Sequence, residues 1–250
     1  MNDMEKIKRD LEKALQASCI VWKPQALDKA AFYLQRIKEE NQNLNLMGDL
    51  SMEEIINKHY LDSLLGFQAL RAEKTVFDTS RDSPPEICDL GSGAGFPGMP
   101  LKLHHPAYLW VFLDSSRKKI NFLKYLTRQM QLSGVSFINQ RAEIAARNRE
   151  VRESYDGVVA RAVAAISVLS EWGLPLLKIG GKLILYKGEE VSQELKESQP
   201  AMKACGGEVS KVYEYQLLTG EKRKMVVLEK INTTPENYPR KPGRAKRQPL

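Results

Sequence analysis

The feature that most limits the possible folds is a glycine-rich segment that directly follows a short apolar run. Residues 87–90 have the pattern of a buried strand, and they lead into Gly91-Ser92-Gly93-Ala94-Gly95. A glycine segment between a strand and a helix is typical of open α/β sheets, which bind ligands at the carboxyl ends of their strands. Glycine allows positive φ and leaves room where a Cβ would block a ligand. The sequence therefore predicts a ligand site at Asp89–Gly98.

The stretch that follows this segment alternates between apolar runs and helical patterns. Besides the strand at 87–90, four runs predict strands, at residues 109–113, 135–138, 157–160 and 183–186. Ser116 is placed to cap one of the intervening helices. After a predicted helix near 190–204, two strand-like stretches follow in succession, at 208–217 and 225–231. This order predicts an α/β fold with a Rossmann-like, mostly parallel sheet that ends in an antiparallel hairpin.

Outside this stretch the chain is helical, polar or basic. Apolar residues recur at helical spacing between Ile7 and Leu34, and Ser51 and Glu54 have the spacing of a capping box for a third helix. Pro84-Pro85 closes a polar stretch that predicts a linker. The predicted organisation has four parts: an N-terminal helical segment (1–70), a linker (71–85), the sheet domain (86–232) and a basic tail (233–250).

Charge and composition narrow the classes of function. The formal net charge is +7, and the thirteen residues 238–250 contain five Lys or Arg and no acid, which suits the phosphates of a nucleic acid. A solubilising disordered end is the alternative for this tail. No apolar run approaches the roughly 18 to 20 residues of a membrane span, so no membrane partner is expected. Three widely spaced cysteines predict a reducing cytoplasm and no metal cluster.

The glycine segment admits two classes of cofactor. Gly93, Gly95 and Gly98 match G-x-G-x-x-G, the fingerprint of dinucleotide-binding folds. Asp114 ends the next strand, where an acid accepts hydrogen bonds from the ribose hydroxyls of a nucleoside cofactor. A nicotinamide-dependent oxidoreductase therefore remains an alternative to a methyltransferase.

Three features favour S-adenosylmethionine over a dinucleotide. Asp89 precedes the first glycine and brings a carboxylate towards the cofactor's cationic end, where a pyrophosphate would be repelled. Pro97 and Pro100 crowd the start of the following helix, although proline is tolerated in a first turn. The terminal antiparallel hairpin is more typical of a methyltransferase sheet than of a simple dinucleotide-binding fold.

Several stretches, in order and at matching spacing from about Asn41 onward, carry a family resemblance. They are Asn45-Leu46, Lys58-His59-Tyr60-Leu61-Asp62-Ser63, residues 89–101 with Phe96-Pro97-Gly98-Met99-Pro100-Leu101, residues 113–119, Arg141-Ala142-Glu143, residues 156–162 and Tyr238-Pro239-Arg240-Lys241-Pro242-Gly243. Together they resemble the bacterial small-subunit ribosomal RNA guanine-N7 methyltransferase family, RsmG (GidB). The chain departs from the family pattern at Met47-Gly48.

The resemblance implies a class I S-adenosylmethionine-dependent methyltransferase sheet. It also implies methyl transfer to N7 of a guanine in a 16S rRNA loop, helix 18 near the decoding centre, with 16S rRNA or the small subunit as partner. The enzyme is expected to be cytoplasmic and monomeric. The residues expected at the cofactor are Asp89, Gly91, Gly93, Gly95, Phe96, Asp114, Ala142, Glu143 and Arg161.

Guanine N7 carries a lone pair and no proton, so the transfer needs alignment of the reactants and no general base. We therefore assign no certain catalytic residue, and Arg161 is the candidate because it ends a strand on the expected rim. A surface ion pair is the simpler interpretation of Arg161. Asp62 lies four residues after Lys58, and a local helix pair would account for it.

The residues expected to contact RNA are basic or aromatic-polar side chains outside the glycine segment. They are Lys58, His59, Arg117, Lys124, Arg128, Lys187, Arg240, Lys241 and Arg244. A packed histidine would equally explain His59, and a solvated helix face would explain the three basic residues between 117 and 128. A third hypothesis, motivated by the basic tail, is an RNA-binding module without catalytic activity.

Overall fold

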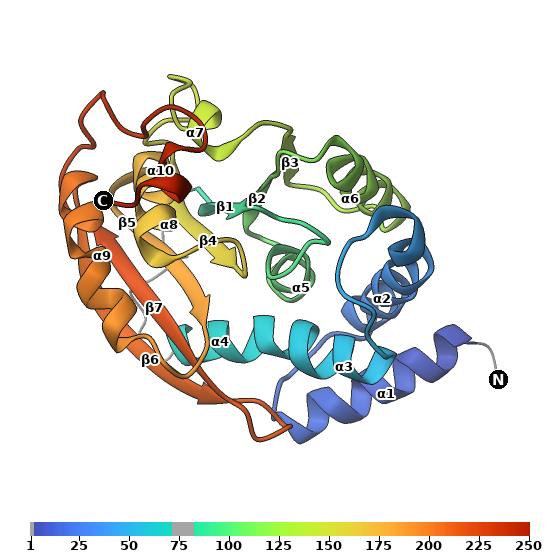
Figure 1. The fold of residues 1–250 in the computed structure, drawn as a ribbon. Coiled ribbons are helices and arrows are strands. Elements are labelled where there is room, and N and C mark those ends of the chain that lie inside the picture. The colour runs from blue at the N-terminus through green and yellow to red at the C-terminus, as the bar shows by residue number, and fades with distance from the viewer. Residues whose placement is uncertain (1–2, 72–82) are drawn as a thin grey trace.

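The structure is a computed structural model, and it describes residues 3–71 and 83–250. One seven-stranded sheet runs through it in the order β3-β2-β1-β4-β5-β7-β6 (Figure 1). Its strands are β1 (Glu86–Leu90), β2 (Leu109–Leu113), β3 (Val135–Ile138), β4 (Tyr155–Arg161), β5 (Leu177–Lys187), β6 (Gly207–Gln216) and β7 (Lys222–Lys230). Strands β1 to β5 are parallel, and β7 is antiparallel to both β5 and β6. The predicted parallel sheet with a terminal antiparallel hairpin is confirmed.

Helices precede, connect and follow the strands. They are α1 (Asp3–Ala17), α2 (Pro24–Leu44), α3 (Met52–Ile55), the π-helix η1 (Ile56–Leu61), α4 (Asp62–Arg71), α5 (Gly98–His104), α6 (Arg117–Gln129), α7 (Ala142–Ala145), α8 (Ile166–Gly173), the 3-10 helix η2 (Leu174–Leu176), α9 (Ser192–Ala204) and α10 (Arg244–Arg247). None of the helices in the two described ranges is long and apolar enough to cross a membrane.

Successive strand residues point to opposite faces of the sheet, so each face has its own core. On one face Ile87 and Trp110 join a cluster with residues of the helices α1 to α6 and of η1. On the other face Cys88 and Val111 pack with α7 to α10. Parallel strands buried on both faces are typical of this fold class.

The N-terminal helices belong to the first of these cores. Helix α4 lies along the sheet beside β6 and β7, and α1 and α2 lie outside it (Figure 1). The Tyr186 hydroxyl on β5 donates a hydrogen bond of 2.7 Å to the carbonyl of Ser63 on α4. The predicted helical segment therefore covers the sheet directly. Residues 72–82 of the predicted linker lie outside the described residues.

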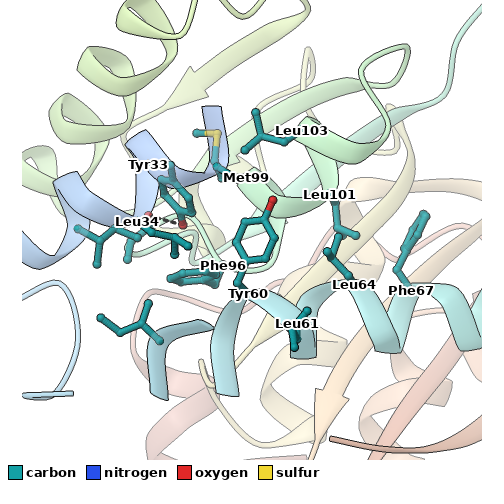
Figure 2. Packing of buried hydrophobic residues seen from close by; sticks show 14 of the residues in the cluster. Tyr33, Leu34, Tyr60, Leu61, Leu64, Phe67, Phe96, Met99, Leu101 and Leu103 are labelled. Carbon is teal, nitrogen blue, oxygen red and sulfur yellow. Dashed lines mark hydrogen bonds between the residues drawn. The ribbon is translucent and has the colours of Figure 1, made fainter. Parts of the chain in front are cut away.

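Side chains from α2, η1 and the glycine segment meet in one apolar cluster (Figure 2). Tyr33 on α2 and Tyr60 on η1 lie close to Phe96, and all three are buried. The Tyr33 hydroxyl donates a hydrogen bond of 3.1 Å to the carbonyl of Ala94 (Figure 2). The N-terminal helices thereby support the back of the glycine segment.

Two predicted helix starts are confirmed, and one irregularity is new. Ser51 and Glu54 form the reciprocal capping box at the start of α3, and the Ser116 side chain caps the start of α6. The helix that follows the capping box continues to Arg71, but its residues 56–61 are π-helical. A π-helical turn is rare and often marks a functional site, and here it contains His59.

Candidate functional site

A cavity of about 490 Å³ lies at the carboxyl ends of β1, β2 and β4, the edge at which open α/β sheets bind ligands. Seven of the nine residues expected at the cofactor line it: Gly91, Gly93, Phe96, Asp114, Ala142, Glu143 and Arg161. The other two, Asp89 and Gly95, do not line it. The structure therefore brings most of the predicted cofactor residues to one cavity.

The glycine segment forms the floor of this cavity. The amide groups of Gly91 and Ser92 both donate to the carbonyl of Leu113 at the end of β2, at 2.8 and 3.1 Å. Gly91 has φ +74°, and a Cβ there would lie 2.8 Å from a methyl carbon of Val163. Only glycine satisfies both the backbone conformation and the close packing at this position.

Asp114 stands beside the segment at the end of β2. Its Oδ2 accepts a hydrogen bond of 2.9 Å from the Gly93 amide, and its Oδ1 accepts one of 2.7 Å from the Ser116 amide. A carboxylate offers about four lone-pair sites, so about two remain for a ligand. The two amides hold the carboxylate in place at the cavity wall, where sequence analysis expected the ribose.

Asp89 has a different environment from the one expected. It is fully buried, and its Oδ2 accepts a hydrogen bond of 3.0 Å from the amide of Gly98 at the start of α5. Its Oδ1 accepts no hydrogen bond from any residue in the described ranges. Burial raises the pKa of Asp89 to about 7, against the opposing effect of the Gly98 amide. The carboxyl group lies behind the cavity wall and fixes the turn into α5.

Arg161, at the end of β4, is joined to the π-helical turn of the N-terminal helices. Its Nη1 donates to Asp62 Oδ2 at 2.9 Å and to the carbonyls of Lys58 and His59 at 3.2 and 3.3 Å. Its side chain is 10% exposed and that of Asp62 is 7% exposed. Arg161 therefore belongs to a buried ion pair, and its interpretation as a surface ion pair is wrong. The interpretation of Asp62 as the local partner of Lys58 is also wrong, because the partner of Asp62 is Arg161. Tyr215 also donates to Asp62 Oδ1, at 2.7 Å.

The π-helical turn exposes the carbonyl groups that Arg161 contacts. Arg161 Nη2 also contacts Nδ1 of His59. A guanidinium has only donors, so Nδ1 must accept and the ring proton must sit on Nε2. Burial, together with the positive charge of Arg161, lowers the pKa of His59 to about 3. His59 is therefore neutral above that pH, with one N–H donor that no described residue accepts.

A second cavity, of about 420 Å³, adjoins the first. His59, Arg161 and Ala162 line both cavities and form the wall between them. Phe96 packs behind this wall, with its ring centroid 5.4 Å from that of His59 and 5.2 Å from the Arg161 guanidinium carbon. Lys58, Lys187 and Arg223 also line the second cavity, and each of them is paired with a glutamate. The structure therefore has two adjacent cavities with a shared wall.

The far end of the first cavity is formed by α7 and the C-terminal segment. Ala142 and Glu143 begin α7, and Glu143 is only 3% exposed. Glu143 Oε1 accepts a hydrogen bond of 2.8 Å from the amide of Gly243. Gly243, Lys246 and Trp172 line this end and were absent from the sequence-based site. Gly243 belongs to a stretch of the family resemblance, but nothing local in the sequence placed any of the three at this cavity, because their contacts join residues far apart in the chain.

The residues expected to contact RNA occupy several environments. Arg117, Lys124 and Arg128 are exposed on α6, and Lys241 and Arg244 are exposed in the C-terminal segment. Lys58 and Lys187 line the second cavity, where Lys187 pairs with Glu194 at 2.8 Å. Arg240 is half-buried and its guanidinium pairs with Glu171. The predicted tail is therefore folded against the protein, and the interpretation as a disordered end is wrong.

The family profile described as GidB: rRNA small subunit methyltransferase G matches residues 26–226. The chain is 39% identical over 228 residues to "Ribosomal RNA small subunit methyltransferase G" of Bacillus cytotoxicus, covering 91% of this chain and 92% of that protein. It is 38% identical over 240 residues to the protein of the same name from Bacillus cereus, covering 96% of this chain and 97% of that protein.

Among solved structures, TrmN from Thermus thermophilus aligns with a TM-score of 0.48 and 16% identity, over 70% of this chain and 53% of that chain. That likeness is too distant to add to the assignment. The sheet order, the cavity beside the glycine segment and the match over most of the chain agree, and the protein belongs to the rRNA small subunit methyltransferase G family.

Proposed function

We propose that the protein transfers a methyl group from S-adenosylmethionine to N7 of a guanine in a loop of 16S rRNA, the helix 18 loop near the decoding centre. The observation that carries the proposal is the pair of adjoining cavities with His59 and Arg161 between them. The choice of rRNA follows the names of the relatives, and the choice of N7 and of the loop follows the family resemblance.

The first cavity suits S-adenosylmethionine. Its glycine floor leaves backbone groups open to a ligand, and Asp114 retains acceptor capacity for two ribose hydroxyls. Ala142 and Glu143 would lie by the adenine, and Arg161 forms the wall towards the second cavity. When bound, S-adenosylmethionine supplies a methyl group made electrophilic by the neighbouring sulfonium.

The second cavity suits a guanine that has left its stack. Enzymes that modify a base must extract it from the stack, and single-stranded loops make this easiest. The wall offers N–H donors on His59 and Arg161, and guanine O6, next to N7, is an acceptor. Lys58, Lys187 and Arg223 line this cavity and are candidates for contacts with flanking phosphates, in exchange for their glutamate partners.

The residues of the wall are suited to alignment and not to proton transfer. Guanine N7 has no proton to remove, and the Nδ1 of His59 is already occupied by Arg161. Holding two reactants in a near-attack geometry can supply a large part of catalysis by itself. The ion pair with Asp62 and the contact with Phe96 keep Arg161 fixed for this purpose.

The dinucleotide alternative is disfavoured by the same geometry. In a dinucleotide-binding fold the pyrophosphate occupies the amino terminus of the helix after the glycine segment. Here the Gly98 amide at that position donates to the buried Asp89 carboxyl, and neither Gly95 nor Gly98 lines the cavity. We infer that this helix end serves to hold Asp89.

Two measurements test the proposal. Isothermal titration calorimetry should give a saturable signal with S-adenosylhomocysteine and none with NADH; binding of NADH alone would contradict the proposed cofactor. Mass mapping of 16S rRNA methylation, with and without the protein, should locate one 7-methylguanosine in the helix 18 loop. If the protein binds S-adenosylhomocysteine but does not methylate small subunits that lack the modification, the alternative of an RNA-binding module without catalytic activity is favoured. We expect the active enzyme to be cytoplasmic and monomeric.

A further inference from the structure

The C-terminal strap, which we define as residues 234–247, is held to the protein along most of its length. Arg152 donates to the carbonyls of Thr234 and Tyr238, at 2.6 and 2.9 Å. Arg147 donates through Nε to the carbonyl of Pro239 at 2.9 Å. These two arginines lie between α7 and β4, beside the cofactor cavity. In Figure 1 the strap, drawn in red, loops along the side of the sheet that carries α7 and α8 and ends at α10, next to both helices.

The strongest anchor of the strap is the pair formed by Arg240 and Glu171. Arg240 Nε donates to both carboxylate oxygens at 3.0 Å, and Nη2 donates to Oε2 at 2.6 Å. The Arg240 amide adds a fourth hydrogen bond, of 2.7 Å, to the same carboxylate. The side chain of Glu171 is 1% exposed and that of Arg240 is 15% exposed. Removing one partner of such a buried, bidentate pair strongly destabilises the structure, because the other charge is left buried without a partner.

Beyond this anchor the strap enters the wall of the first cavity. Gly243 adopts φ +79°, and its amide donates to Glu143 Oε1, so the strap holds the carboxylate at the end where adenine is expected. Ala245 is 1% exposed against α8, and Lys246 Nζ lies 5.2 Å from the centroid of the Trp172 ring. Gly243, Lys246 and Trp172 all line the cavity.

We propose that the C-terminal strap is a structural wall of the cofactor site, and that Arg240 is the positioning residue that holds it there. The proposal rests on the proposed function, since it takes the first cavity as the place of S-adenosylmethionine. The strap lies outside residues 26–226, which match the family profile. This role of Arg240 replaces the sequence-based expectation that Arg240 contacts RNA, because its guanidinium is already paired with Glu171.

The physical consequence concerns Glu143. When the strap is in place, this buried carboxylate has a fixed donor in the Gly243 amide. Without the strap, Glu143 would lose that donor and the end of the cavity would open to water. The ligand would then have to order the wall on binding, and the cost of ordering would appear as weaker affinity.

The test compares two arginines in the same segment. Arg240→Ala removes the anchor, whereas Arg247→Ala removes the same charge from an exposed side chain in α10. We expect Arg240→Ala to weaken S-adenosylhomocysteine binding about tenfold by calorimetry, equivalent to about 1.4 kcal/mol. Arg247→Ala should leave that affinity within about twofold. In kinetics, Arg240→Ala should raise KM for S-adenosylmethionine while kcat at saturation and KM for small subunits stay close to wild type.

A second measurement needs no variant and covers the case in which Arg240→Ala does not fold. Hydrogen–deuterium exchange of the wild-type strap should slow when S-adenosylhomocysteine is added, most clearly at the amide of Gly243. Exchange that is unchanged by saturating ligand would overturn the proposal. A second result would also overturn the proposal: Arg240→Ala and Arg247→Ala lose the same affinity for small subunits, and both keep their affinity for the cofactor. That result would indicate an RNA-binding tail. Wild-type protein that binds no S-adenosylhomocysteine would instead refute the proposed function.

Discussion

The two sides of the cofactor cavity are built in different ways. The floor is local in sequence, because the glycine segment and Asp114 lie within 25 residues of Asp89 and are joined by backbone amides. The opposite sides depend on contacts between distant residues, from His59 to Arg161 and from Glu143 to Gly243, about 100 positions apart. The comparison teaches that a local motif supplies the floor, while polar contacts between distant residues supply the other sides.

The largest expected effect concerns the remote side. Asp62→Ala leaves the Arg161 guanidinium, which is only 10% exposed, without its carboxylate partner. Removing one partner of a buried ion pair lowers the free energy of unfolding by about 3–5 kcal/mol. Urea unfolding should show this loss in the free energy of unfolding. Lys8→Ala is the control, because it removes a solvent-screened surface pair with Asp28 and should change stability far less. Equal losses in the two variants would mean that the ion pair does not hold the remote side.

A pH experiment examines the local side through Asp89. Its pKa is about 7 in the folded protein and near 3.8 in the unfolded chain. Between these values the folded state keeps a proton that the unfolded state has lost, so this residue lowers stability as pH rises from 4 to 7, by at most about 4 kcal/mol. Asp89→Asn keeps an acceptor for the Gly98 amide but does not titrate.

Unfolding of wild type and Asp89→Asn should therefore be measured at pH 5 and pH 8. The variant should gain stability relative to wild type at the higher pH. A difference between the two proteins that is the same at both pH values would show that Asp89 ionises normally despite its burial.

A smaller effect should separate ligand binding from folding. Asp114→Ala removes the carboxylate expected at the ribose, and we expect about tenfold weaker binding of S-adenosylhomocysteine, or about 1.4 kcal/mol. Calorimetry measures the affinity, and Asp28→Ala serves as the control, because it removes an exposed carboxylate on α2 that does not line the cavity. Unchanged affinity in Asp114→Ala would place the ribose elsewhere and would remove the local floor from the cofactor site.

The smallest effect concerns the exposed basic face of α6. Lys124→Ala should weaken binding to small subunits modestly and reduce the dependence of log affinity on log salt concentration by about one unit, as expected for one phosphate contact. Filter binding at several salt concentrations measures this slope. Lys196→Ala, on α9, removes the same charge elsewhere. If the slope is the same in wild type and Lys124→Ala, the basic face of α6 is exposed to solvent and does not contact RNA phosphates.

The sequence predicted the features that depend on neighbouring residues. Strand positions, the capping box of Ser51 and Glu54, and the glycine floor follow from local hydrophobic periodicity and backbone geometry. The π-helical turn could not be predicted, because its carbonyls are stabilised by Arg161 from β4. For the same reason the spacing of Lys58 and Asp62 was misleading, since a tertiary partner replaced the local one.

The C-terminal segment illustrates the same limit. Its five basic residues indicated phosphate binding, and net charge alone does not reveal that one of them has a buried acid as partner. Glu171 lies 69 residues earlier, in a helix whose apolar pattern gave no sign of a buried carboxylate. A basic charge pattern in the sequence does not show whether its partner is another molecule or an acidic residue within the same fold.

The position of β7 in the sheet has a consequence for assembly. β7 follows β6 in the chain, yet it lies between β5 and β6 and provides the strand pairing for both. Until β7 is in place, β5 has an open edge on that side and β6 has no strand to pair with. Tyr215 on β6 reaches Asp62 only when all three strands are aligned. Strand β7 thus holds β6 in the sheet, and with it the contact of Tyr215 with helix α4.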